Sequence, residues 1–354
     1  MKNLEYVSIR WKNDSLHILD QRKLPNEETY IIAQTSEDIF HAIKDMVVRG
    51  APLIGFTGIF GILFWVKDVF SSEEELNQIS KYLNSSRPTA INLSFELDNA
   101  VSLVKNAIKK DKTQEETMQL ILDHAMAQID KIRIDNQKMA DLAADHLYKL
   151  YGEKKLNIVT LCNTGFLACG PMGTALGVIS NLSKLNRVNM VYTSETRPYL
   201  QGSRLTSYEL KKEGIDHRII VEGAHSYILE NKQIDAVFIG ADRIVSNGDT
   251  ANKIGSSTLC LIAKHYNVPF FVVAPTSSFD LSLETGDDIE IELRDEDEIL
   301  RYKEYLIAPK GATAINPSFD ISRGEYIRAI FCEKGDISPV TNEKISIVHA
   351  ASNE

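Results

Sequence analysis

The sequence has little positive charge for its size. Its 354 residues include 39 Lys and Arg against 49 Asp and Glu, which gives a formal net charge of −10. Non-specific binding of nucleic acid depends on cations that displace counterions from the phosphates, so this balance argues against a nucleic-acid partner. It leaves room for a small phosphorylated substrate, because a few well-placed cations can bind one phosphate against an acidic average.

Cysteine is also scarce. The four cysteines are Cys162, Cys169, Cys260 and Cys332, and they form neither a C-x-x-C pair nor a Cys/His cluster with the spacing of a zinc site. So few thiols in so long a chain indicate reduced cysteines in a cytoplasmic protein. The sequence therefore predicts neither a disulfide framework nor a metal site.

Long hydrophobic runs are missing as well. The first residues contain no apolar run of the kind found in secretory signals. The longest uncharged stretch, residues 51–66, is shorter than the roughly 18 to 20 apolar residues of a membrane span. Gly55, Gly58 and Gly61 recur in it at every third position, which favours a helix face packed on a neighbour over a membrane or nucleotide site. We expect no membrane partner.

The length corresponds to about two domains, and the hydrophobic fraction of 44% is enough for a core in each. The chain opens with a short β-rich segment. Two apolar runs at residues 7–11 and 16–19 flank Asn13 and Asp14, which predicts a hairpin with its turn at these two residues.

Helical patterns follow as far as residue 152. Capping-box sequences at residues 72–75 and 113–116 each predict the start of a helix. The last long periodic segment ends at Gly152, a residue type typical of helix ends. We therefore expect a mainly helical N-terminal domain, with a short β-rich start, at residues 1–152.

The sequence pattern changes after residue 152. Short apolar runs rich in Val and Ile alternate with helical patterns, and the runs are residues 156–161, 188–193, 218–221, 236–239 and 270–274. This alternation indicates βαβ units and a parallel sheet covered on both faces. The expected fold class is α/β, with a Rossmann-like domain at residues 153–354. Ligands of such sheets bind beyond the carboxyl ends of the strands, so candidate residues are sought directly after each run.

Cys162 follows the first run and precedes a glycine-rich segment at residues 165–173. Backbone N–H groups of such a segment can approach an anion. The segment lacks the Lys and Ser/Thr of a P-loop and contains no G-x-G-x-x-G. Nearby N–H dipoles can lower the pKa of a thiol, so Cys162 is either a reactive thiol or a buried structural one.

Asp242 follows the fourth run. Desolvation at that position would raise the pKa of its carboxyl and suit a general acid, while the alternatives are a surface pair with Arg243 or a capping role. Further along, Asn252 and Lys253 stand near an expected helix start and can hold a phosphate or hydroxyl groups. A lone Lys is, however, more often a solvated surface charge.

Three further segments combine arginine with turn residues, at residues 49–52, 85–89 and 195–204. The planar guanidinium group suits phosphate oxygens. Each segment alone is a weak signal, because Arg-Pro also ends helices. Three of them in an acidic chain favour a phosphate-binding function, although composition alone does not decide it.

Taken together, these segments resemble the methylthioribose-1-phosphate isomerase family, which is related to the regulatory subunits of the translation initiation factor 2B complex. The matching stretches are RGAPLIG (49–55), SSRPTAINL (85–93), LCNTG (161–165), GTALGVI (173–179), ETRPYLQGSRLTSYEL (195–210), GADRIVSNGDTANKIG (240–255) and NPSFDIS (316–322). They extend over nearly the whole chain.

The resemblance implies an aldose–ketose isomerase of methionine salvage, usually a homodimer, that acts on a small phosphorylated pentose without a metal or organic cofactor. Position by position, Cys162 and Asp242 match the family's catalytic pair. The positions that match its substrate-binding residues are Arg49, Gly50, Ala51, Arg87, Gln201, Asn252 and Lys253.

Two stretches depart from the family pattern. EGAHSY at residues 222–227 replaces a frequent D-x-M-A-A run, and bulkier residues stand at 166 and 169–171. Such changes bear on the pocket for the 5-substituent, so 5-deoxyribose 1-phosphate and ribose 1,5-bisphosphate stay open beside methylthioribose 1-phosphate. A bisphosphate needs an additional cluster of cations, for which the sequence offers no clear candidate. His225 is one residue that could make such a contact, but a surface helix His is the commoner case.

The alternative from another class is a non-catalytic regulatory subunit, similar to the translation-factor relatives, that senses a sugar phosphate or nucleotide and binds partners. Retention of Cys162 and Asp242 together with the matching Arg, Gln, Asn and Lys positions favours the isomerase.

Overall fold

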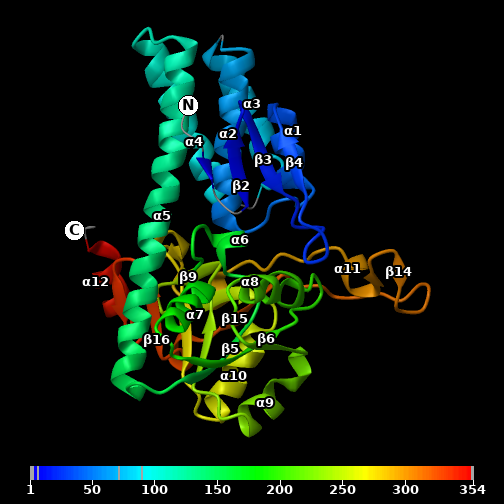
Figure 1. Ribbon diagram of the computed structural model, residues 1–354, viewed down its shortest axis with the longest axis vertical. Helices are drawn as coiled ribbons and strands as arrows, with labels where there is room; N and C mark the ends of the chain where they lie inside the picture. The colour runs from blue at the N-terminus through cyan, green and yellow to red at the C-terminus, as the bar shows by residue number, and fades with distance from the viewer. Residues whose placement is uncertain (1–3, 6–7, 71, 89–90, 352–354) are drawn as a thin grey trace. The chain divides into compact units, whose positions relative to one another are not determined.

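The computed structural model describes residues 4–5, 8–70, 72–88 and 91–351 (Figure 1). Packing divides the chain into two compact units. The first comprises Met1–Ile134 with Gly165–Gly173, and the second Asp135–Thr164 with Thr174–Glu354. The division between residues 134 and 135 falls inside helix α5 (Gln114–Tyr151).

Helix α5 contributes to both units, which explains where the division falls. Ile121 and Ile129 in its first half belong to the core of the first unit. In its last turn, the Tyr151 hydroxyl donates to the carbonyl of Asp235 in the second unit (2.7 Å). The domain boundary expected at residue 152 corresponds to the end of this helix, and it stays a prediction.

The first unit opens with an antiparallel sheet of order β1-β2-β3-β4. Its strands are β1 (Leu4–Glu5), β2 (Ile9–Lys12), β3 (Ser15–Leu19) and β4 (Tyr30–Ala33). Asn13 and Asp14 join β2 to β3 with φ angles of 51° and 54°, the left-handed geometry of a two-residue hairpin. The predicted hairpin is confirmed; residue 7 lies outside the described residues.

Helices make up the rest of this unit: α1 (Ser36–Lys44), α2 (Ala51–Asp68), α3 (Glu73–Asn84), α4 (Ile91–Lys109), the first part of α5, and α6 (Phe166–Cys169). The Ser72 hydroxyl accepts the N–H of Glu75 (3.2 Å) at the start of α3. Thr113 and Glu116 form the reciprocal bonds of a capping box before α5. Both predicted helix starts are therefore confirmed.

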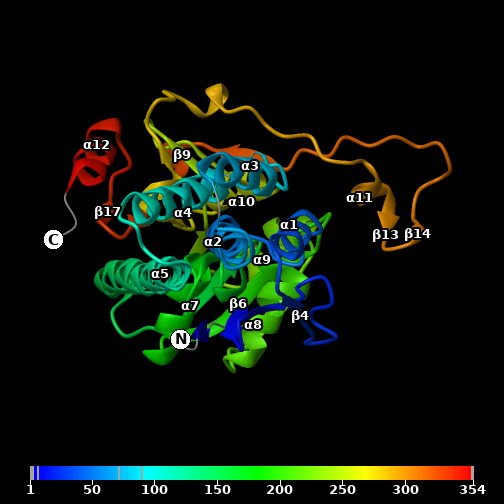
Figure 2. The ribbon, with the colours of Figure 1, turned by 90° about the horizontal axis from the view of Figure 1, so that it is seen from above.

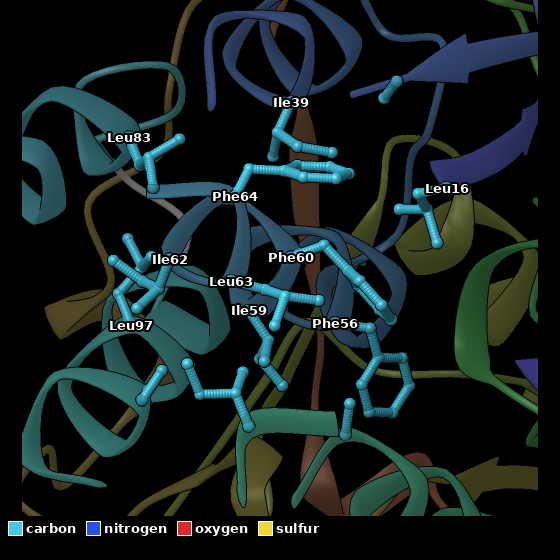
Figure 3. Packing of buried hydrophobic residues seen from close by; sticks show 14 of the residues in the cluster. Leu16, Ile39, Phe56, Ile59, Phe60, Ile62, Leu63, Phe64, Leu83 and Leu97 are labelled. Carbon is cyan, nitrogen blue, oxygen red and sulfur yellow. The ribbon is translucent and has the colours of Figure 1, made fainter. Parts of the chain in front are cut away.

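Helix α2 forms the centre of the first core. Its phenylalanines Phe56, Phe60 and Phe64 are buried, and Figure 3 shows Leu83 and Leu97 around the same helix. A helix that is apolar on all sides belongs inside a protein or a membrane. Within the described ranges, every helix is too short or too polar to cross a bilayer.

The three glycines of α2 lie against neighbouring helices. A methyl group added at Gly55 would lie 2.9 Å from the carbonyl oxygen of Asn92, and one at Gly58 would lie 2.5 Å from Leu93 Cδ1, both on α4. Gly61 approaches α3 in the same way. The interpretation of this spacing as a packing face is confirmed.

The second unit is built on a seven-stranded sheet of order β17-β16-β11-β8-β5-β6-β7, parallel except for β17 (Figure 1). Its strands are β5 (Leu156–Thr160), β6 (Val188–Ser194), β7 (His217–Ile220), β8 (Ala236–Ile239), β11 (Phe270–Val273), β16 (Ala329–Cys332) and β17 (Gly335–Ile337). Each apolar run identified in the sequence forms one of the parallel strands. The α/β class with a Rossmann-like sheet is confirmed.

Helices of this unit include α7 (Ala175–Lys184), α8 (Ser207–Lys212), α9 (His225–Asn231), α10 (Ser256–His265) and α12 (Asn342–Ala350). A smaller sheet accompanies them, of order β12-β9-β10-β15, with β9 (Arg243–Val245), β10 (Thr250–Lys253), β12 (Phe279–Asp280) and β15 (Phe319–Ser322). The Asn247–Gly248 turn joins β9 to β10, with Gly248 at φ 85°.

An arm extends from the second unit at residues 281–318. It carries α11 (Asp297–Leu300) and a hairpin of β13 (Arg301–Tyr302) and β14 (Tyr305–Leu306), drawn in orange away from the sheet of that unit in Figures 1 and 2. Tyr302, Tyr305 and Leu306 on this hairpin are exposed. The acidic run at residues 287–298 lies on this arm.

The packing of α2 generates a test. We expect Gly55→Ala to lower the free energy of unfolding of the first unit by about 1–3 kcal/mol, because the added methyl group meets backbone that cannot rotate away. In an unobstructed helix the same change would stabilise by about 1 kcal/mol. Denaturant titration followed by circular dichroism measures the difference. Gly223→Ala, whose added methyl group meets no atom of the described residues within 4 Å, is the control. An unchanged midpoint for Gly55→Ala would contradict the packing.

Candidate functional site

The candidate residues of the second unit lie after neighbouring strands. Cys162 follows β5, Gln201 follows β6 and Asp242 follows β8, and β5 lies between β6 and β8 in the sheet. The loops after β5 and β8 touch, because a methyl group added at Gly240 would lie 2.6 Å from Thr164 Cγ2. Cys162, Gln201 and Asp242 thus all follow the carboxyl ends of parallel strands, where the sequence argument expected candidate residues.

Cys162 is buried, with 7% of its surface exposed, and has a φ angle of 66°. Its backbone N–H donates to Thr196 Oγ1 (2.9 Å), and its carbonyl accepts a hydrogen bond from the Thr206 hydroxyl (2.6 Å). Burial alone suits a structural cysteine. A cysteine, unlike the Asn and Asp of a turn, is rarely held in the left-handed region, and backbone strain of this kind occurs at functional sites.

Gln201 presents a buried acceptor. Only 5% of its surface is exposed, and its Oε1 atom has no hydrogen-bond partner among the described residues. The next residue, Gly202, starts the π-helical turn η1 (Gly202–Thr206), and a methyl group there would lie 1.6 Å from the Ser194 carbonyl oxygen. Only glycine fits this contact, so it fixes the path of the chain beside Gln201.

Asp242 differs from the expectation. It lies three residues beyond the end of β8 and is exposed, with its backbone N–H bonded to the carbonyl of Ala251 (2.9 Å). The desolvation inferred from the preceding apolar strand is therefore wrong, since the buried run ends at Gly240. The neighbouring Arg243 forms an ion pair with Asp280 (3.3 Å).

Asn252 and Lys253 lie at the end of β10, close to the start of α10. Asn252 is buried and donates through Nδ2 to Ser256 Oγ (2.8 Å). Lys253 is half-buried: its ammonium group donates to the Ser318 carbonyl (3.0 Å) and lies 4.7 Å from the centre of the Phe319 ring. The alternative of a freely solvated lysine is therefore wrong.

The remaining candidates belong to the first unit. Arg49 is half-buried and precedes Gly50, whose φ is 90° and where a methyl group would lie 2.4 Å from the carbonyl oxygen of Ala168 in the glycine-rich segment. Ala51 begins α2, and Arg87 is half-buried in the turn after α3. The structure thus brings Gly50 against the glycine-rich segment within this unit. Residues 89 and 90 of the SSRPTAINL stretch lie outside the described residues.

His225 is fully buried, which corrects the expectation of a surface helix residue. Its Nε2 lies 2.7 Å from Ser194 Oγ, and its Nδ1 has no partner among the described residues. Burial lowers the pKa of the imidazole to about 4, so the ring is neutral near pH 7. A neutral ring does not provide the additional cation that a second phosphate would need.

Sequence reasoning missed Thr196, Thr206 and Glu222. Glu222 Oε1 accepts the N–H of Thr196 (2.6 Å). Burial, followed by the Glu222 charge, raises the pKa of Glu195. Thr196 and Thr206 stand inside the ETRPYLQGSRLTSYEL stretch, but nothing in the sequence distinguishes these threonines from others. Among the described residues, no three His, Cys, Asp or Glu side chains gather in a way that could hold a metal ion.

A parallel sheet with polar residues grouped at its carboxyl edge defines a Rossmann-like ligand-binding class. Residues 47–339 match the model of the initiation factor 2 subunit family. The methylthioribose-1-phosphate isomerase of Caldicellulosiruptor saccharolyticus is 40% identical over 349 residues, covering 98% of both chains. The one from Leptospira interrogans is 42% identical over 351 residues, covering 95% of this chain and 96% of its own.

Solved structures agree with the sequence relatives. The 5-methylthioribose 1-phosphate isomerase from Pyrococcus horikoshii matches with a TM-score of 0.89 at 33% identity, over 97% of this chain and 96% of that one. The delta subunit of translation initiation factor eIF-2B from A. fulgidus matches with a TM-score of 0.88 at 34% identity, over 98% and 100%. The chain therefore belongs to the initiation factor 2 subunit family, and within it to the methylthioribose-1-phosphate isomerase family that its sequence resembles.

The buried imidazole generates a second test. Between about pH 6.5 and pH 4 the unfolded chain binds a proton on His225 that the folded chain does not, so stability falls as the pH drops through this window. From pH 7 to pH 5 the expected loss is about 2 kcal/mol, which His225→Gln should remove. Denaturant midpoints at both pH values measure it. His265→Gln, on the exposed end of α10, is the control; equal pH dependence in the wild type and His225→Gln would contradict the burial.

Proposed function

We propose that this protein is an aldose–ketose isomerase that converts 5-methylthioribose 1-phosphate to 5-methylthioribulose 1-phosphate in methionine salvage. The observation that carries the proposal is identity of about 40% over nearly the whole chain to relatives named for this activity. The chain also has the residues of the family's catalytic pair and substrate-binding set at the matching positions, which supports the proposed activity further.

The chemistry gives roles to the catalytic pair. A phosphate on O1 blocks spontaneous opening of the sugar ring, so the ring oxygen must be protonated before hydrogen moves from C2 to C1. We assign protonation of the ring oxygen to Asp242, because this residue matches the acid of the family's catalytic pair. Cys162 then removes the C2 proton and returns it to C1, while the proton of the C2 hydroxyl restores the acid form of Asp242. Stabilisation of the developing charge is the alternative role of Cys162. Each acid–base contribution is worth roughly 10² to 10⁴ in rate. These steps need no metal or organic cofactor.

Binding is assigned to the other positions. We propose Arg49, Arg87 and Lys253 as substrate-binding positions, because each matches a substrate-binding residue of the family and a cationic side chain suits a phosphorylated substrate. Gln201 and Asn252 are assigned to sugar hydroxyls. The buried Oε1 of Gln201, which has no hydrogen-bond partner in the part of the chain that the structure describes, supports an acceptor role. Gly50 and Ala51 complete the set with the backbone at the start of α2.

Two other substrates of the same class remain. 5-Deoxyribose 1-phosphate requires the same chemistry with a smaller 5-substituent. Ribose 1,5-bisphosphate requires a second cationic site, and the neutral, buried His225 argues against it. A non-catalytic regulatory role is the candidate from another class, and the 34% identity to the eIF-2B delta subunit from A. fulgidus is the observation in its favour.

We also propose a cytoplasmic homodimer without a nucleic-acid partner. The acidic net charge supports the absence of nucleic-acid binding. The exposed apolar side chains of the arm, among them Tyr305 and Ile307, are typical of surfaces that another protein covers.

The substrate assignment is tested by measuring kcat/KM for the three sugar phosphates side by side. We expect methylthioribose 1-phosphate to lead. Loss of the methylthio group should cost about 10- to 200-fold, the usual effect of a small apolar group in a pocket. A higher kcat/KM for either alternative would reassign the substrate, and no turnover of any of the three would favour the regulatory role.

The catalytic pair is tested by substitution. Cys162→Ala and Asp242→Asn should each lower kcat by roughly 10² to 10⁴, because each removes one acid–base group. Cys332→Ala is the matched control, since this thiol is also buried but lies on β16 and donates to the Gly335 carbonyl (3.4 Å). Near-normal kcat for both site variants would show that the assignment is wrong.

A further inference from the structure

The backbone of Cys162 is held in an unfavourable conformation. Its φ angle of 66° lies in the left-handed region, which costs a residue with a side chain about 1–2 kcal/mol. Such a conformation persists only where surrounding contacts impose it. The contacts that hold this peptide therefore also fix the direction of the Cα–Cβ bond, and with it the position of the thiol.

Two threonine hydroxyls hold the residue from both sides. Thr196 Oγ1 accepts the N–H of Cys162 (2.9 Å), and the Thr206 hydroxyl donates to the carbonyl of Cys162 (2.6 Å). Both threonines follow β6, the strand beside β5, and both are almost completely buried. The strained backbone of Cys162 is therefore held by hydrogen bonds from the segment after β6, and not only by the loop after β5 in which it lies.

Further hydrogen bonds fix the orientation of each hydroxyl. Thr196 donates its proton to the Ser194 carbonyl (3.1 Å), which leaves its oxygen to accept from Cys162. Thr206 accepts from Asn163 Nδ2 (3.3 Å), so its single proton is directed to the Cys162 carbonyl. Asn163 is held in turn by the buried carboxylate of Glu209 (2.7 Å). Both threonine hydroxyls therefore have a donor and an acceptor.

We propose that Thr206, together with Thr196, is a positioning residue that orients the Cys162 thiol for proton transfer. The inference rests on the proposed function, since it assigns Cys162 a part in the reaction. A shift of a reacting group by about 1 Å can cost 10²-fold in rate, so loss of one of these bonds acts on kcat without any contact between the threonine and the substrate.

The kinetic test uses Thr206→Val, which keeps the shape of the side chain and removes the hydroxyl, and Thr206→Ser, which keeps the hydroxyl. We expect Thr206→Val to lower kcat by about tenfold to a hundredfold with little change in KM. Thr206→Ser should restore most of the loss. If Thr206→Val does not fold, Thr206→Ala serves in its place.

A matched control separates positioning from stability. Thr160 is an equally buried threonine whose hydroxyl donates to the carbonyl of Phe238 (2.9 Å). Thr160→Val removes a comparable buried hydrogen bond without touching Cys162. We expect a fall in melting temperature for both valine variants, larger for Thr206→Val because it also removes the acceptor of Asn163 Nδ2, and an unchanged kcat for Thr160→Val.

A second measurement requires no substrate. The rate at which iodoacetamide alkylates Cys162, followed across pH by mass spectrometry of its peptide, should change in Thr206→Val and remain at the wild-type profile in Thr160→Val. If Thr206→Val or Thr206→Ala equals Thr160→Val in kcat and in alkylation, the proposal is overturned. If the wild type turns over none of the sugar phosphates, the function fails, and the alkylation profiles alone decide the positioning role.

Discussion

The parallel pairing of β5 with β6 on one side and β8 on the other is the constraint on which the candidate site depends. Thr160 at the end of β5 lies opposite Thr193 and Phe238, so the chain leaves all three strands at the same edge. A slip of one residue in this register would reverse every side chain on the strand. The Thr160 hydroxyl donates to the carbonyl of Phe238 (2.9 Å), a hydrogen bond between β5 and β8 that such a slip would break.

Much of this arrangement could be predicted from the sequence, because it follows from periodicity. The parallel strands are recognisable as short apolar runs. The rule that ligands bind at the carboxyl ends of such strands then selects Cys162 and Asp242 from the sequence alone. Likewise, Ser72 and Thr113 begin helices because local hydrogen bonds decide a helix start. Helix starts set by local hydrogen bonds and strands with a strong apolar pattern can therefore be predicted from a single sequence.

The features that could not be predicted depend on contacts between segments that are far apart in the sequence. The buried state of His225 depends on its contact with Ser194, 31 residues earlier, and an amphipathic pattern does not encode that contact. The exposure of Asp242 reflects the path of the chain after β8. The strands of the smaller sheet contain two to four residues each and show too little alternation to be recognised. The left-handed geometry of Cys162 has no sequence signal at all.

Gly202 limits how this protein can be redesigned. The carbonyl of Ser194 occupies the space where any other residue would place its first carbon, so the turn after β6 admits no other residue at this point. An engineer who wants a different sugar phosphate can exchange side chains that face the ligand. At Gly202 the path of the turn cannot be changed by a single substitution, because the Ser194 carbonyl would have to move as well.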